Sequence, residues 1–184
     1  HGVFRRQRQM CIRDRLIGGD GIGYTYSFSE YERFIDNVNE FSKHSNNQIL
    51  CVTSRRTDPK VENLFFQNIK QISEHSIWFH RGGANADLAK LFGSAQHIMV
   101  TEDSAMMISE AISSGNLVTT IYPKVINSPS RYDNQIQHYL NRGFMSRSSM
   151  EATISLDFNR KNSSALIEGV QKQLVKSIIE KIQL

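Results

Sequence analysis

Short apolar runs alternate along this chain with longer segments in which apolar residues recur every three or four positions. The apolar runs are typical of buried strands, and the longer segments are typical of amphipathic helices. Five runs are expected to form strands, at residues 16–18, 49–53, 76–80, 97–101 and 117–122. Because strands and helices alternate, the sequence predicts an α/β fold in which a Rossmann-like parallel sheet carries helices on both faces.

Capping and stop signals place the helices between these strands. Ser29 and Glu32 have the spacing of a capping box for a first helix, and Pro59 fits the first turn of a second. Residues 86–92 predict a short third helix, and residues 104–114 predict a fourth that stops at Gly115. The later segments are a helix at 131–142 before Gly143, a stretch without clear assignment at 145–162, and an amphipathic helix at 163–184.

The first fifteen residues differ in character from the rest of the chain. They carry five arginines against the single acidic Asp14, show no apolar periodicity, and are typical of translated adapter sequence. We therefore predict that residues 1–15 are not native. The remaining chain then carries 17 basic and 17 acidic residues, of the 22 and 18 in total, so the pI of about 9.1 does not indicate nucleic-acid binding. The alternative is a basic arm that binds phosphate backbones or an anionic membrane.

Cysteine, histidine and hydropathy exclude several classes of protein. Cys11 lies in the first fifteen residues and Cys51 in an apolar strand, so neither a disulfide framework nor a metal set is expected. The spacing of His44, His75, His97 and His138 does not indicate a metal, and we predict no metal site. No signal peptide or run of 18 apolar residues is present, which favours a reducing, cytoplasmic setting.

Residues 100–111 read as a buried strand, a tight polar turn and the first turns of a helix. In an open α/β sheet, ligands bind beyond the carboxyl ends of the strands, where helix N-termini offer N–H groups to phosphate. We expect Asp103, Ser104, Ala105 and Met106 to form that phosphate site. Glu110 is placed to accept a hydrogen bond from a ribose hydroxyl.

Two further loops belong to the same predicted edge. Gly18 and Gly19 follow the first strand, and their backbone N–H groups can face an anion, although tight loop geometry alone also explains them. Ser54, Arg55 and Arg56 follow the second strand, where a guanidinium can grip a diphosphate with paired donors. The alternative is that these arginines pair with carboxylates at the edge and hold loops together.

Catalytic residues are not assigned by the pattern. Glu102 and Asp103 are adjacent carboxylates that could divide acid and base roles, but carboxylates at a helix start are more often caps and dipole partners. His80, expected at the end of the third strand, could stack on a base or act as a general base. Ser104 lacks a histidine spaced to activate it as a nucleophile.

Three of these motifs also carry a family resemblance. The stretches at 16–20 (LIGGD), 52–59 (VTSRRTDP) and 100–111 (VTEDSAMMISEA) resemble the mitochondrial fission protein family of plants and its bacterial relatives, over residues 16–123. Gly115-Asn116-Leu117-Val118 departs from the family's Gly-Lys-Pro-Val, and residues 82–87 depart from its Asn-Pro-Tyr, which removes a lysine and a Pro-Tyr pair.

The family in turn resembles glycosyltransferases of the two-Rossmann-domain (GT-B) type. The resemblance implies that residues 16–162 form the C-terminal, nucleotide-binding domain of such a protein and that an N-terminal half precedes it. It also implies that residues 163–184 brace that half, with self-packing of the helix as the alternative. Glu110 matches the ribose-binding glutamate of these transferases.

Two functions follow from the resemblance. The first is a glycosyltransferase or a nucleotide-sugar epimerase, with a nucleoside diphosphate or nucleotide-sugar as ligand and no further cofactor. The N-terminal half would then supply the acceptor site and the base, so this fragment is expected to be inactive alone. The second is a non-catalytic scaffold that recruits protein or membrane partners, with membrane association only through the missing half.

Overall fold

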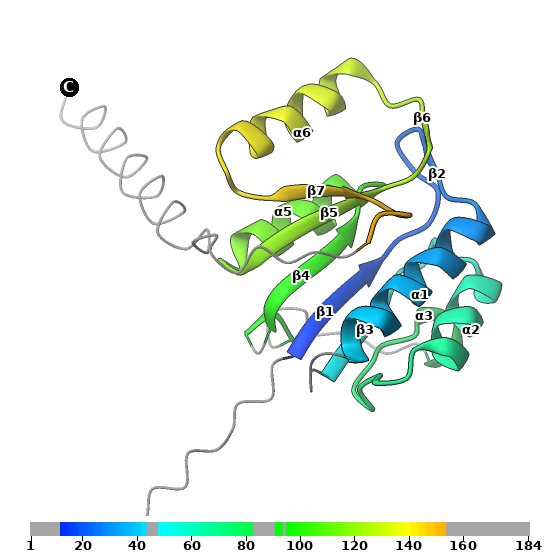
Figure 1. Cartoon of the computed structure of the whole chain (residues 1–184). Helices are drawn as coiled ribbons and strands as arrows, with labels where there is room; N and C mark the ends of the chain where they lie inside the picture. Colours follow the sequence, from blue (N-terminus) through cyan, green and yellow to red (C-terminus); the bar gives the residue numbers. More distant parts are fainter. Residues whose placement is uncertain (1–11, 44–47, 83–90, 94, 154–184) are drawn as a thin grey trace, which may run out of the picture.

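The computed structural model describes residues 12–43, 48–82, 91–93 and 95–153. Their centre is a five-stranded, wholly parallel sheet with strand order β3-β1-β4-β5-β7 (Figure 1). The strands are β1 (Ile12–Ile17), β3 (Gln48–Thr53), β4 (Ala95–Thr101), β5 (Leu117–Tyr122) and β7 (Ser146–Ser149). A two-stranded ribbon, β2 (Tyr24–Thr25) with β6 (Val125–Ile126), joins the loops that follow β1 and β5.

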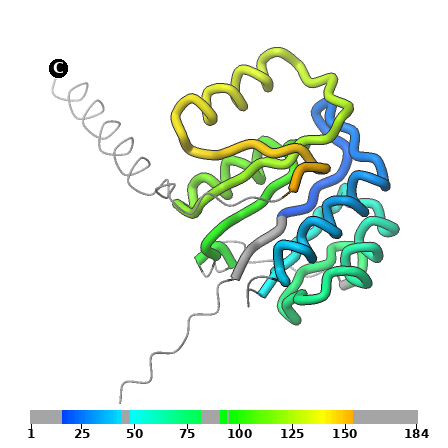
Figure 2. Tube along the Cα trace, viewed as in Figure 1, coloured from blue at the N-terminus to red at the C-terminus, as the bar shows by residue number. Residues whose placement is uncertain are grey.

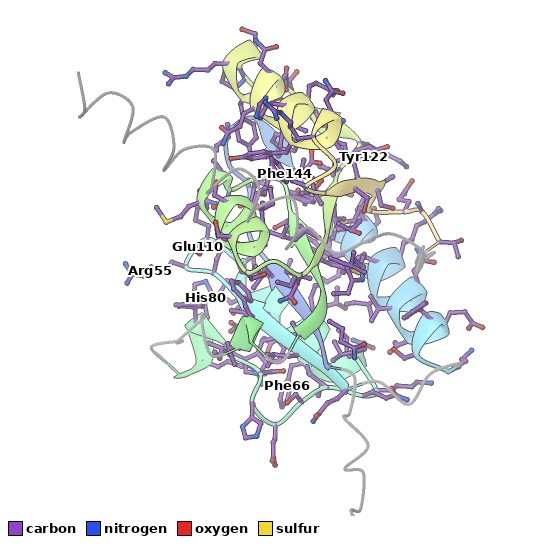
Figure 3. The ribbon with its side chains drawn as sticks, turned by 90° about the vertical axis from the view of Figure 1, so that its left-hand side faces the viewer. Arg55, Phe66, His80, Glu110, Tyr122 and Phe144 are labelled. Carbon is purple, nitrogen blue, oxygen red and sulfur yellow. The ribbon has the colours of Figure 1, made fainter. Side chains whose placement is uncertain are left out.

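Helices cover both faces of this sheet, which confirms the predicted fold class. They are α1 (Phe28–Lys43), α2 (Pro59–Asn68), α3 (Phe79–Gly82), α5 (Ala105–Ser113) and α6 (Ser130–Asn141). Figure 3 shows α1 and α5 on opposite sides of the sheet. Strands β3 and β4 are buried almost throughout, as expected for a parallel sheet covered on both faces.

The expected third strand at residues 76–80 is wrong in its second half. Ile77 makes a single parallel bridge to Val52, and its N–H group donates to the carbonyl of Cys51 at 2.8 Å. The chain then turns into α3, because the Thr53 hydroxyl accepts from the N–H of Phe79 at 2.9 Å. If the position of Ile77 is counted as a strand beside β3, the sheet has six strands. Numbered in chain order, they follow the doubly wound order 3-2-1-4-5-6, and the direction of this order changes between β1 and β4.

The helix ends follow the sequence signals with one correction. The capping box of α1 is formed by Ser27 and Glu30 rather than by the expected Ser29 and Glu32: the Ser27 N–H donates to Glu30 Oε2 at 2.8 Å. Glu30, rather than Glu32, completes the capping box. Its other carboxylate oxygen accepts from the Lys124 N–H at 2.7 Å, which ties α1 to the loop after β5.

The other helix boundaries agree with the expectations where the structure describes them. Asp58 caps α2 with Pro59 in its first turn, and Ser104 caps α5 by accepting from Met107 at 3.4 Å. Gly115 and Gly143, with φ angles of 78° and 71°, follow the ends of α5 and α6. The predicted helices at 163–184 and, for the most part, 86–92 lie outside the described residues.

Strand β7 occupies part of the stretch that the sequence left unassigned. After it, the chain returns to α1, where Asn37 Nδ2 donates to the carbonyl oxygens of Glu151 and Ala152 at 3.3 and 3.0 Å (Figure 2). Arg33 adds a weaker ion pair to Glu151, at 3.7 Å. The last described residues therefore fasten the edge of the sheet to the helix that covers its centre.

The interior strand β1 contains charged residues. Strand β1 begins at Ile12, four residues earlier than expected, so Arg13, Asp14 and Arg15 belong to an interior strand. Such strands are usually apolar on both faces. The expectation that residues 1–15 are not native stays a prediction.

Candidate functional site

Two adjacent carboxylates, Glu102 and Asp103, follow the central strand β4, and both side chains are fully buried. Their hydrogen bonds run in opposite directions along the edge of the sheet. Glu102 contacts residues of β5 and β7, whereas Asp103 contacts the loops that follow β1 and β3. The carboxyl edge is therefore built around this pair.

Glu102 is held by groups from both neighbouring strands. Arg147 forms a two-pronged ion pair, with Nε to Oε1 and Nη2 to Oε2 both at 2.8 Å, and the Thr120 hydroxyl donates to Oε1 at 2.6 Å. Paired donors of this kind are among the strongest polar contacts in proteins. Arg147 also lies over the ring of Tyr122, at 4.3 Å from its centroid.

The backbone of Glu102 is fixed as well. Its N–H group donates to the hydroxyl of Tyr26 at 2.8 Å, and its carbonyl accepts from the hydroxyl of Tyr132 at 2.7 Å. The Tyr26 hydroxyl in turn donates to the carbonyl of Ile121 at 2.9 Å. With its side chain and backbone bonded within the protein, Glu102 holds the edge together.

Asp103 ties the other half of the edge together. Arg56 Nη2 lies 2.6 Å from Asp103 Oδ2, and the Gly19 N–H donates to the same oxygen at 3.3 Å. Burial raises the pKa of the Asp103 carboxyl, and the opposing effects of Thr101 and Arg56 do not cancel this. For Arg56, the structure thus shows the alternative in which an arginine pairs with a carboxylate and holds loops together.

The two glycines after β1 are explained by close approach. A Cβ atom on Gly18 would lie 2.1 Å from Asp103 Oδ1, and one on Gly19 would lie 2.0 Å from the backbone oxygen of Arg56. The N–H groups of these glycines, which were expected to face an anion, donate instead to Thr101 Oγ1 and Asp103. In this structure both groups are used within the protein.

Ser54 and Thr57 shape the loop that carries the two arginines. Thr57 is buried, and its hydroxyl oxygen lies 2.8 and 2.9 Å from the carbonyl oxygens of Ile17 and Gly18. The Ser54 N–H donates to the same hydroxyl at 2.8 Å. The loop is therefore anchored to the end of β1, and Arg55 is left exposed without an ion pair among the described residues.

The remaining predicted residues lie on the α5 side of the sheet. Ser104 caps α5, Ala105 and Met106 form its first two positions, and Met106 is 71% exposed. Glu110 is also exposed, and its carboxylate makes no hydrogen bond with the described residues. Figure 3 places Arg55 and Glu110 on the same side of the molecule, together with His80. His80 belongs to α3 rather than to a strand end, and it is exposed.

A pocket of about 640 Å³ opens on the α1 and α2 side of the same edge. Its lining combines aromatic, acidic and basic side chains from three segments: Gly19, Asp20, Tyr26, Phe28, Tyr31, Arg56, Asp58, Lys60 and Val61. The predicted site residues are thus divided, because Gly19 and Arg56 line this pocket while Arg55 and Glu110 lie on the other side. Within the described residues, no cluster of His, Cys, Asp or Glu is suited to hold a metal ion.

Sequence reasoning missed most of this lining and the anchor Arg147. Aromatic residues follow the glycine loop at positions 24, 26 and 28, and their clustering could have indicated a pocket at this edge of the sheet. Arg147 lies in the stretch without clear periodicity, so its partnership with Glu102 had no local signal.

The close approach of the glycine loop predicts a graded response to alanine. Gly19→Ala should lower the free energy of unfolding by about 1–3 kcal/mol, because the new methyl group meets backbone that cannot move aside easily. Gly21→Ala should cost less, since its closest contact would be 2.9 Å. Urea denaturation of both variants measures the difference, and equal effects would contradict the packing described here.

The raised pKa of Asp103 predicts a pH dependence of stability. The native carboxyl binds its proton more tightly than the unfolded one, so its contribution to stability is present at low pH and falls as pH rises above about 4. Asp103→Asn removes this titration. The free energy of unfolding of the wild type, relative to Asp103→Asn, should therefore fall between about pH 4 and neutrality, and a rise would contradict the sign.

Comparison with known structures supports the fold assignment. The glycotransferase of kitacinnamycin superposes with a TM-score of 0.50 at 12% identity, covering 90% of this chain and 38% of that one. At this identity the likeness concerns the fold alone, and the chain spans 38% of the glycotransferase. Weaker likenesses are YcaC from Pseudomonas aeruginosa (TM-score 0.44, 12% identity, 82% and 81% covered) and the Moco carrier protein from Chlamydomonas reinhardtii (0.42, 11%, 90% and 99%).

Sequence comparison gives a family but no curated relative. No curated protein matches the chain. In the described part of the chain, no helix has both the length and the apolar content needed to cross a bilayer. The family described as Mitochondrial fission ELM1 matches residues 11–166, which include every described strand from β1 to β7. Since this match covers most of the sequence, the chain belongs to the Mitochondrial fission ELM1 family.

Proposed function

We propose that this domain binds a nucleotide-sugar, as the nucleotide-binding part of a glycosyltransferase or a nucleoside-diphosphate-sugar epimerase. The observation that carries the proposal is the set of unpartnered polar groups on the α5 side of the carboxyl edge. It comprises the start of α5, Arg55 and Glu110, and it lies beside the position where the strand order reverses. Ligands of open α/β sheets bind at such positions.

The start of α5 and Arg55 fit a diphosphate. Ala105 and Met106 are the first two helical residues, whose N–H groups have no partner within a helix. The partial positive charge of a helix N-terminus favours phosphate. Arg55 can add paired donors, because its guanidinium has no ion pair among the described residues.

Glu110 fits a ribose. It lies six residues after the cap Ser104, so it is about one and a half turns into α5. Its exposed carboxylate can accept hydrogen bonds from two neighbouring hydroxyl groups. Met106, at 71% exposure, offers a flexible apolar surface for the base.

The buried carboxylates bear on catalysis. Glu102 and Asp103 are each engaged by an arginine and have no exposed side-chain surface. We therefore place the catalytic base outside the described residues, and we expect the chain to bind nucleotide without turnover by itself.

A scaffold role is the alternative, and it has an observation of its own. Four of the exposed large apolar residues follow the carboxyl ends of strands: Ile22, Phe28, Met106 and Val125. An apolar rim of this kind also fits a protein partner.

A titration with nucleoside diphosphates and nucleotide-sugars, followed by ligand-observed NMR, tests the proposal. We expect saturable binding that weakens at least tenfold in Glu110→Ala, because the ribose hydroxyls lose a charged acceptor. Glu32→Ala, an exposed glutamate on α1, should bind as the wild type does. Absence of binding by a folded protein would overturn the proposal and favour the scaffold.

A further inference from the structure

The pocket on the α1 and α2 side is separate from the groups assigned above to the nucleotide. Arg56 lines the pocket and covers Asp103, whereas Arg55 and the start of α5 lie on the other side. We propose that this pocket is a saccharide site, which holds an uncharged sugar ring against Phe28 with its hydroxyl groups bound by Tyr31, Asp20 and Asp58. Its volume of about 640 Å³ lies in the range of small-molecule sites.

Tyr31 supplies a hydroxyl group that a ligand in the pocket can reach. The side chain lines the pocket, and its hydroxyl makes no hydrogen bond with the described residues. A tyrosine presents an apolar ring with a polar tip that can bond to a ligand. Burial and the nearby carboxylates raise the pKa of Tyr31, so the group stays neutral and can both donate and accept. A sugar hydroxyl, which does the same, is a matching partner.

Two carboxylates in the lining have one oxygen committed and one available. Asp20 Oδ1 accepts from the Tyr26 N–H at 3.0 Å, and Asp58 Oδ1 accepts from the Lys60 N–H at 2.7 Å. The second oxygen of each makes no hydrogen bond among the described residues. Carboxylates held in place by backbone donors are suited to accept from hydroxyl groups without moving.

The balance of charge disfavours an anionic ligand here. Arg56 is already paired with Asp103, so Lys60 is the remaining cation of the lining opposite Asp20 and Asp58. A phosphate would meet two carboxylates and one available cation. A neutral ligand rich in hydroxyl groups can bond to both kinds of group without adding a charge.

Phe28 gives the pocket an aromatic face. It is 45% exposed at the first position of α1, although apolar side chains of this size gain from burial. The apolar face of a sugar ring would cover it. Phe66, 47% exposed on α2, lies outside the pocket and serves as a matched control.

The experiment titrates the whole chain with glucose, galactose, mannose and N-acetylglucosamine by saturation-transfer NMR, with inorganic phosphate and glycine for comparison. We expect saturable binding of at least one sugar, weakened fivefold or more by Phe28→Ala and about three- to tenfold by Tyr31→Phe. Phe66→Ala should bind as the wild type does. Circular dichroism confirms that each variant is folded, and Tyr31→Phe keeps the buried ring in place.

Three outcomes would overturn the inference: no saturable sugar binding by the folded wild type, sugar binding that neither variant weakens, or stronger Phe28-dependent binding of phosphate or glycine. The inference rests on the proposed function in one respect: the bound sugar would be a reactant of the proposed enzyme. Glu110→Ala separates the two, because it should weaken nucleotide binding at least tenfold and leave sugar binding unchanged. Sugar binding without nucleotide binding would overturn the proposed function alone.

Discussion

The architecture of this domain depends on the burial of two adjacent charges at the end of its central strand. A carboxylate removed from water is strongly unfavourable unless it is paired and hydrogen-bonded. Glu102 meets this requirement through Arg147 and Thr120. Asp103 meets it at Oδ2, through Arg56 and the Gly19 N–H, whereas its Oδ1 has no partner among the described residues. These partners come from β7, β5, and the loops after β3 and β1, so one pair of residues connects all five strands.

That arrangement also decides which groups remain available. Arg56 is held by Asp103, and the N–H groups of Gly18 and Gly19 are bonded within the protein. What stays free on the α5 side is the first turn of α5, the Glu110 side chain, and Arg55, whose loop is anchored to the end of β1 by Thr57. A ligand there would meet groups already in position, which lowers the entropic cost of binding.

The sequence predicted the parts of the fold that have local causes. The strand 117–122, the stop at Gly115 and Pro59 in the first turn of α2 follow from apolar runs and turn chemistry. The capping box shifted because Ser27-Glu30 and Ser29-Glu32 share one pattern, and a contact with distant Lys124 decides between them. Strand β7 is polar and is defined by its pairing with β5. The different fates of Arg55 and Arg56 likewise depend on Asp103, 47 residues beyond Arg56.

The opposite orientation of the two carboxylates has a consequence for strand alignment. Strand β4 is apolar on both faces at Ile98, Met99 and Val100, so alternation of side chains does little to fix its position against β1 and β5. A slip by one residue would carry Glu102 and Asp103 away from their arginines and leave unpaired charges in the interior. Misaligned pairings are thereby disfavoured, so the acidic pair fixes the register of β4 against its neighbouring strands.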